Sequence, residues 1–263
     1  MITATPLSDS IVRLRRLQEA NGSIRKTQLL RKFQDDANFR NFLYYALNPM
    51  LTYKISEQTL RSPTRYDSAI TLTMTDIFSV CELLSKRKAL DAGTVYQVCA
   101  FVQSSPPDEA DVYIKLLSKT LRLGVTAKTV NKVIPNLIPE WEVQQAYPID
   151  KYPLKEGTEF WLTQKLNGVR ATYYKGRLYA RSGVPYEGLD HILDALCFDE
   201  EDSYVFDGEL TLREKGNLSD NEAFRKATGI INSDDGDKTV ICYTIFDVLT
   251  VEEFHRGQSD GSY

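Results

Sequence analysis

Hydrophobic periodicity changes near the middle of this 263-residue chain, and the change limits the folds open to it. In the first half, apolar residues recur at intervals of three and four, which predicts helices at 10–20, 26–33, 38–49, 74–90, 93–103 and 109–124. In the second half, short β-rich runs predict strands at 159–165, 169–175, 177–182, 204–212 and 239–249. Lys175-Gly176 is typical of a hairpin turn between two of them. We therefore expect an α+β protein with an all-helical first half and an antiparallel, β-rich second half.

The boundary between the halves is expected in the proline-rich stretch 136–153, because proline discourages regular structure. We place two domains at 1–139 and 140–263, each long enough to bury a core. Asp108 or Asp111 is expected to cap the last helix of the first domain, and Gly124 to follow its end.

Charge follows the same division. Residues 1–137 contain 19 Lys and Arg against 12 Asp and Glu, whereas residues 138–263 contain 13 against 24. A basic half joined to an acidic half indicates nucleic-acid contact by the basic half, although drift between two unrelated cores explains the pattern equally well.

No apolar run is long enough for a membrane span, and the N-terminus lacks the pattern of an export signal. The four cysteines are far apart and lack zinc-ligand spacing. We therefore expect a cytoplasmic protein without a membrane segment or a zinc site.

One lysine in the second half has the surroundings of a nucleophile. Lys165 is expected at the end of a strand and is followed by Gly168 and Arg170. Glycine allows close approach of backbone to a phosphate, and arginine adds a planar cation. A partly desolvated lysine among cations loses its proton more easily, which yields the neutral amine needed for attack. Alone, the pattern is more often an exposed turn.

Four segments occur in an order that resembles the covalent nucleotidyltransferases, namely DNA ligases, RNA ligases and mRNA capping enzymes. The segments are Lys165–Arg170, Arg181–Gly183, Phe206–Leu210 and Tyr243–Asp247. Asn167 replaces the usual aspartate of the first motif, a change that we expect the chemistry to tolerate.

Residues 72–90 and 121–139 are similar to the helical DNA-binding domain of ATP-dependent DNA ligases, above all the small ligases of tailed bacteriophages. The resemblance implies a helical DNA-binding domain followed by an adenylylation domain. It also implies that the chain is the N-terminal portion of a ligase, without the later motifs and the OB-fold. For this chain we expect at best weak self-adenylylation and no nick sealing.

The resemblance also implies a role for each motif residue. Lys165 would take AMP from ATP, and nucleotide contacts would come from Thr163, Gln164, Lys165, Arg170, Glu209 and Phe246. Arg181 would bind the 5′-phosphate of the nick, and Glu209 would hold Mg²⁺. Asn167, Gly168 and Asp207 would support them. Simpler explanations exist: core packing for Phe246, β-propensity for Thr163, and solvated side chains for the arginines and Asp207.

Cations in the helical half are candidates for contacts to the DNA backbone. Lys115, Lys119 and Arg122 have the spacing of one helical face. Thr126 is expected to cap a further helix that carries Lys128 and Lys132, a suitable cradle for phosphate. A solvated amphipathic face is the simpler explanation.

Three functions follow from the sequence. The first is an ATP-dependent DNA ligase that seals nicked duplex DNA in replication, repair and recombination, as a monomer, in a host cytoplasm if a phage encodes it. The second is a non-catalytic DNA-binding module. The third is an RNA ligase, which the N-terminal domain disfavours.

Overall fold

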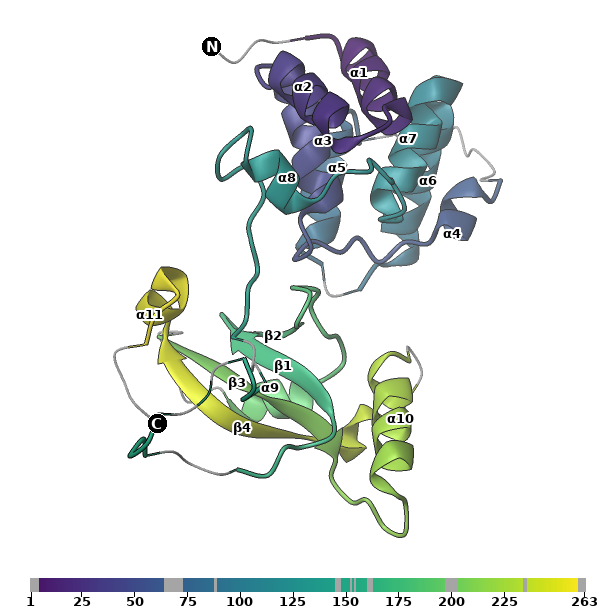
Figure 1. The fold of residues 1–263 in the computed structure, drawn as a ribbon. Coiled ribbons are helices and arrows are strands. Elements are labelled where there is room, and N and C mark those ends of the chain that lie inside the picture. Colours follow the sequence, from purple (N-terminus) through teal and green to yellow (C-terminus); the bar gives the residue numbers. More distant parts are fainter. Residues whose placement is uncertain are drawn as a thin grey trace. The chain divides into compact units, whose positions relative to one another are not determined.

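The computed structural model describes residues 5–63, 73–87, 89–144, 148–151, 153, 155–159, 163–196, 203–233 and 236–259. The chain divides into two compact units, residues 1–140 and 141–263 (Figure 1). None of the helices in the described ranges has the length and hydropathy of a membrane span.

The described part of the first unit contains helices and no strand. The helices are α1 (Leu7–Glu19), α2 (Ser23–Phe33), α3 (Ala37–Leu47), α4 (Glu57–Arg61), α5 (Ile77–Ser85), α6 (Ala92–Ser104), α7 (Pro107–Leu117) and α8 (Ala127–Asn131). Their apolar faces meet in one core that includes Leu14, Phe39, Phe42 and Leu116, all fully buried. The periodic pattern therefore reports a real core face, as expected for amphipathic helices.

Capping residues fix where several of these helices begin. Asp36, Asp76 and Asp91 accept hydrogen bonds from backbone amides in the first turns of α3, α5 and α6. As predicted, Thr126 caps α8, accepting from the amide of Thr129. These side chains satisfy amides that have no partner within the helix.

The sequence prediction for α7 was wrong at both ends. The helix begins after Pro106, so neither Asp108 nor Asp111 is its cap, and it ends at Leu117 rather than near Gly124. Lys119 has a left-handed backbone with φ of 57°, which ends the helical path. The spacing had predicted that Lys115, Lys119 and Arg122 share one helical face. Because the helix ends at Leu117, Lys119 and Arg122 lie outside it, and this prediction was wrong.

The second unit is built on a four-stranded antiparallel sheet in the order β2-β1-β3-β4 (Figure 1). Its strands are β1 (Val169–Tyr174), β2 (Arg177–Ala180), β3 (Tyr204–Leu212) and β4 (Ile241–Thr250). As predicted, β1 and β2 form a hairpin at Lys175-Gly176, where both residues have positive φ. The unit also contains α9 (Asp190–Ala195), α10 (Asp220–Ile231), the short 3₁₀ helix Lys238–Val240 and α11 (Val251–Arg256).

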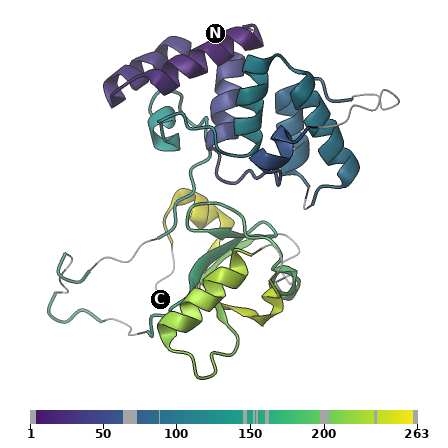
Figure 2. The ribbon, with the colours of Figure 1, turned by 90° about the vertical axis from the view of Figure 1, so that its right-hand side faces the viewer.

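One face of this sheet is covered by α9 and α10 (Figure 2). Ala171, Phe206 and Leu210 of the sheet pack there with Ile192 of α9 and Ile231 of α10. Since strand side chains alternate, the intervening residues of β1 and β3 project to the opposite face. That opposite face carries the polar motif residues.

The strand predicted at 159–165 is not formed in its described part. Residues 160–162 lie outside the described ranges, and residues 163–167 have no regular structure. The prediction that Lys165 lies at the end of a strand was therefore wrong.

Candidate active site

The pairing of β1 with β3 gathers four polar side chains on the face away from α9 and α10. Arg170 pairs with Glu209, and Thr172 pairs with Asp207. Residues directly opposite each other in an antiparallel pair have their side chains on the same face. The register therefore brings two motifs that are 37 residues apart in sequence into contact.

Asp207 and Arg170 form a two-point ion pair. Nε of Arg170 donates to Oδ1 of Asp207 at 3.0 Å, and Nη2 of Arg170 donates to Oδ2. Thr172 Oγ1 also donates to Oδ1 at 3.3 Å. Asp207 is only 8% exposed, so its charge is compensated mainly by these partners rather than by water.

The remaining nitrogen of the Arg170 guanidinium is bound by the backbone segment that precedes the sheet. Nη1 of Arg170 donates to the carbonyl of Gln144. Trp141, three residues earlier, anchors this segment, because its ring packs 4.7 Å from the Tyr179 ring and 5.4 Å from the Phe254 ring. Arg170 is thus fixed by Asp207 on one side and by the 141–144 segment on another.

A β-bulge presents Phe246 to this cluster. The β3–β4 register shifts so that Asp207 pairs with Asp247 but Gly208 pairs with Ile245, which leaves Phe246 as the extra residue. Bulges commonly redirect a side chain in this way. The Phe246 ring lies 5.7 Å from the guanidinium carbon of Arg170, yet remains 47% exposed. An exposed ring held by a cation is suited to stacking on a flat ligand.

The loop that carries Lys165 is tied to β3 through Gly168. The amide of Gly168 donates to Oε1 of Glu209 at 3.0 Å. A Cβ at position 168 would lie 2.3 Å from the carbonyl oxygen of Leu210, so a side chain there would push the loop away from the strand. On the other side of the loop, Asn167 Nδ2 donates to the carbonyl of Asp220 at the start of α10. Asn167 therefore has a structural role.

Glu209 is influenced electrostatically by Lys165. Burial raises the pKa of the Glu209 carboxyl, whereas the amide of Gly168 and the charges of Lys165 and Arg170 act in the opposite direction. Lys165 itself is exposed. The amine is therefore open to a substrate.

A cavity of about 1050 Å³ adjoins the cluster. Its walls include Gln144, Thr172, Asp207, Phe246 and Asp247, together with residues of α11. This volume is sufficient for a nucleotide-sized ligand. Lys165 and Glu209 lie outside its walls.

Three predicted site residues stand apart from this cluster. Thr163 and Gln164 are exposed beside Lys165, and Arg181 is exposed in the turn after β2. The turn is closed by hydrogen bonds from Gly183 to Ala180 and from Ala180 to Val184, both 2.8 Å. The structure therefore brings together Arg170, Asp207, Glu209, Phe246 and Gly168, but not these three. Lys165 is exposed in the loop beside Gly168 and makes no hydrogen bond or ion pair with the cluster within the described residues.

The sequence analysis missed contributors to the site. Thr172 lies two residues after Arg170, a spacing that indicates the same strand face. The side chain of Tyr243 in β4 packs with the core under α9 and α10, and its hydroxyl lies within hydrogen-bonding distance of the carbonyls of Ala171 and Phe206, at 3.0 and 2.8 Å. A Cβ at Gly208 would lie 2.5 Å from the Tyr243 ring, which explains the glycine of the Asp-Gly-Glu motif. Nothing in the sequence indicates the Gln144 carbonyl.

The cations predicted to bind DNA have different environments. Lys115 forms an ion pair with Asp111 at 2.6 Å. Lys119 is largely buried, and its amine donates to the carbonyls of Tyr45 and Asn48 at 3.1 and 2.8 Å. Burial lowers the pKa of Lys119 to about 8. Arg122, Lys128 and Lys132 are exposed.

No known protein-family profile matches the chain. The DNA ligase of Enterobacteria phage T4 is 26% identical over 161 residues, which cover 55% of this chain and 33% of that ligase. The DNA ligase of Enterobacteria phage T6 matches with the same values. Two solved structures, described as Pmar-Lig_PreS3 and Pmar-Lig_Pre, align with TM-scores of 0.56 and 0.55 at 19% identity. Each alignment covers 94% of this chain and 58% of the other.

These matches show what the chain is similar to in sequence and in fold. The chain is homologous to DNA ligases, and its α+β fold is shared with the two solved chains. The relatives in sequence are phage DNA ligases, and the matched segment spans about a third of their length.

Proposed function

We propose that this protein acts in ATP-dependent sealing of nicks in duplex DNA, with Lys165 as the nucleophile. The neutral Lys165 amine attacks the α-phosphorus of ATP, a P–N bond forms, and pyrophosphate leaves as the P–O bond breaks. AMP then passes to the 5′-phosphate at the nick, which frees the lysine. Attack by the 3′-hydroxyl forms the phosphodiester and releases AMP.

The contacts around Lys165 support this chemistry by holding groups in place. The Gly168–Glu209 hydrogen bond restrains the loop that carries the nucleophile, and such positioning supplies much of the catalysis in phosphoryl transfer. Phe246 offers its exposed ring to adenine. Thr163 and Gln164 flank the nucleophile and are open to the nucleotide, while Arg181 is assigned to the 5′-phosphate of the nick.

Arg170 is given a different role from the one that the resemblance implies. Its guanidinium is already bound by Asp207 and by the carbonyl of Gln144. We therefore assign it to positioning Phe246, whose ring lies against its guanidinium.

Of the two carboxylates in the Phe206–Leu210 motif, Glu209 is the better fit for Mg²⁺. Asp207 is occupied by Arg170 and Thr172, whereas Glu209 accepts one amide hydrogen bond at Oε1 and is partly buried. Carboxylate oxygen is the ligand type that Mg²⁺ prefers. The ion would neutralise charge on phosphate oxygens.

The helical unit is assigned to the DNA duplex. Its basic composition and the exposed cations Arg122, Lys128 and Lys132 support backbone contacts that carry no sequence preference. Lys119 contributes charge from a buried position. Lys115 is the weakest candidate, because Asp111 neutralises it.

The observation that carries the proposal is the tether between the Lys165 loop and the strand bearing Glu209. The test is incubation with Mg²⁺ and α-labelled ATP, followed by measurement of acid-stable label on the protein. We expect label on the wild type and none on Lys165→Ala. Absence of label, or equal label on both proteins, contradicts the proposal.

A non-catalytic DNA-binding module is the second candidate, favoured by the prior engagement of Arg170 with Asp207 and Gln144. It predicts salt-sensitive binding of nicked duplex without any label on Lys165. Labelled protein that joins RNA nicks and ignores DNA nicks would instead indicate an RNA ligase.

A further inference from the structure

The chain turns back on itself directly after β2. Beyond the turn, the amide of Tyr186 donates to the carbonyl of Leu178 in β2 at 2.8 Å, so residues 184–186 run back along that strand. Residues 181–183 form the tip of this small hairpin, and we call them the Arg181 turn. The guanidinium of Arg181 is exposed and makes no hydrogen bond or ion pair within the described residues. The turn therefore presents a cation that is open to a ligand.

The side chain of Tyr186 ties this hairpin to β1. Its hydroxyl donates to the carbonyl of Arg170 at 3.2 Å, and its ring packs on the core of the second unit. Burial raises the pKa of the Tyr186 hydroxyl to about 12, and the charge of Glu209 acts in the same direction. The hydroxyl therefore stays protonated near neutral pH, where it serves as a constant donor.

The register of the sheet shows what this bond holds in place. The last residue of β2, Ala180, pairs with Ala171 of β1. One position further, Arg181 leaves the sheet at the level of Arg170, which pairs with Glu209 of β3. Since neighbouring strands are about 4.8 Å apart, the Arg181 turn begins about two strand spacings from Glu209. Tyr186 thus anchors the turn to the same part of β1 that faces the proposed metal ligand.

We propose that Tyr186 is a positioning residue for recognition of the nick: its hydroxyl fixes the Arg181 turn beside the Arg170–Glu209 pair, where Arg181 receives the 5′-phosphate. The inference rests on the proposed function, which assigns Arg181 to that phosphate. Without the bond, the turn would have to be ordered when DNA binds, at a cost in conformational entropy. Loss of the hydroxyl should therefore weaken recognition of the 5′-phosphate rather than binding of the duplex as a whole.

The test compares binding of the full chain to two nicked duplexes in the absence of ATP. One duplex has a 5′-phosphate at the nick and the other has a 5′-hydroxyl, so the ratio of the two Kd values measures recognition of the phosphate. A hydrogen bond from arginine to phosphate predicts a preference of about tenfold or more in the wild type. We expect Arg181→Gln to abolish this preference. Tyr186→Phe, which keeps the ring, should lower it about three- to fivefold.

A double variant shows whether Tyr186 acts through Arg181. If it does, adding Tyr186→Phe to Arg181→Gln causes no further loss of affinity for the duplex with the 5′-phosphate. A merely structural effect of the hydroxyl would lower that affinity again in the double variant, and this outcome contradicts the proposal.

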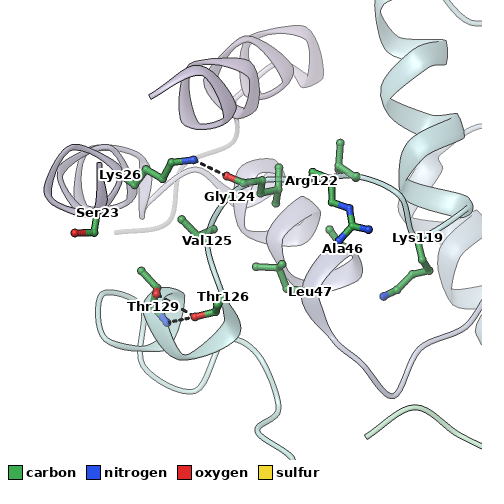
Figure 3. A pocket seen from close by; sticks show the side chains of 12 residues that line it. Ser23, Lys26, Ala46, Leu47, Lys119, Arg122, Gly124, Val125, Thr126 and Thr129 are labelled. Atoms are coloured by element: carbon green, nitrogen blue, oxygen red, sulfur yellow. Dashed lines mark hydrogen bonds between the residues drawn. The ribbon is translucent and has the colours of Figure 1, made fainter. Parts of the chain in front are cut away.

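Two controls address unspecific effects. Tyr179→Phe removes a neighbouring buried hydroxyl that makes no hydrogen bond within the described part of the chain, and it should leave the ratio unchanged. Lys26 belongs to the other unit, where it lines a cavity of about 460 Å³ with Lys119 and Arg122 (Figure 3). Any change in affinity caused by Lys26→Gln should be equal for the two duplexes, so the ratio should again stay that of the wild type.

Failure of this inference can be told apart from failure of the proposed function. If Tyr186→Phe keeps the wild-type ratio while Arg181→Gln loses it, the inference is wrong and the assignment of Arg181 stands. If Arg181→Gln keeps the preference, or if the wild type has none, the assignment of Arg181 is wrong and the inference fails with it. Label on Lys165 tests the nucleophile separately from both.

Discussion

The amide of Gly168 donates a 3.0 Å hydrogen bond to the carboxylate of Glu209. This bond joins the loop that contains the proposed nucleophile to the strand that contains the proposed metal ligand. Since Gly168 also lies against the Leu210 carbonyl, the contact depends on the absence of a side chain.

Replacing Gly168 by alanine tests this dependence. The new Cβ would lie 2.3 Å from the Leu210 carbonyl, so the loop must move away from β3. We expect the free energy of unfolding to fall by about 1–3 kcal/mol, as in other overpacked sites. Self-adenylylation should fall at least about tenfold as the tether is lost. Denaturant titration and label incorporation measure the two effects.

The matched control is Gly229→Ala in α10. A Cβ at position 229 meets nothing within 4 Å, and the residue lies inside a helix. Alanine should therefore stabilise the protein by about 0.5–1 kcal/mol without changing the label. Equal label loss in both variants would show that the Gly168 tether has no special part.

Asp207→Asn removes the charge that holds Arg170. The pair is partly buried and doubly hydrogen-bonded, so we expect a loss of about 3–5 kcal/mol in unfolding free energy. A double-mutant cycle with Arg170→Leu should show strong coupling, because removal of both charges leaves neither one unpaired. Asp194→Asn, an exposed aspartate of α9, is the control. Additive effects of the two substitutions would argue against the ion pair.

Phe246→Ala tests the proposed adenine contact. Because the ring is 47% exposed, its loss should change stability by less than about 1 kcal/mol. The KM for ATP in self-adenylylation should rise about tenfold, with Phe246→Tyr close to the wild type. Val240→Ala, at a comparably exposed valine outside the walls of the cavity, should leave KM unchanged. A stability loss of several kcal/mol with constant KM would instead assign Phe246 to core packing.

Lys119 predicts a pH dependence of the helical unit. Burial lowers its pKa in the folded protein to about 8, from an ordinary value of 10.5. Between these values the unfolded chain binds a proton that the folded chain has released, so stability rises with pH across this window. The contribution amounts to at most about 3 kcal/mol.

The measurement is the difference in unfolding free energy between the wild type and Lys119→Gln from pH 7 to pH 10.5. We expect the difference to grow in favour of the wild type as pH rises. Lys115→Gln, at a surface lysine paired with Asp111, is the control. A constant difference between wild type and Lys119→Gln would contradict the effect of burial.

The helical pattern was predictable wherever apolar spacing reflected a core face, as in α1 and α3. It failed after Leu117, because Leu121 and Leu123 are also buried although they lie in a segment without regular structure. Helix α10 was overlooked, although Ser219 and Glu222 form a capping box that its sequence signals. The end of α7 and the presence of α10 depend on local backbone conformation, which the spacing of apolar residues does not encode.

The candidate site was predictable as a set of motifs, but not as a set of contacts. Register between β1 and β3 follows from which residues must face the core, so Arg170 and Asp207 share a face. The Gln144 carbonyl reaches Arg170 only because Trp141 anchors the preceding segment. Such tertiary contacts leave no trace in residue spacing.

The bulge at Phe246 has a consequence for how β4 tolerates change. In a regular ladder, only one of two successive residues points to a given face. The additional residue allows Asp247 to pair with Asp207 while Phe246 meets Arg170, so an aromatic ring and a carboxylate stand side by side. Substitutions at Phe246 or Asp247 can therefore change which side chains this face presents without disturbing the strand. Inserting or deleting one amino acid of β4 before the bulge would instead turn its core-facing side chains outward and its outward-facing side chains inward.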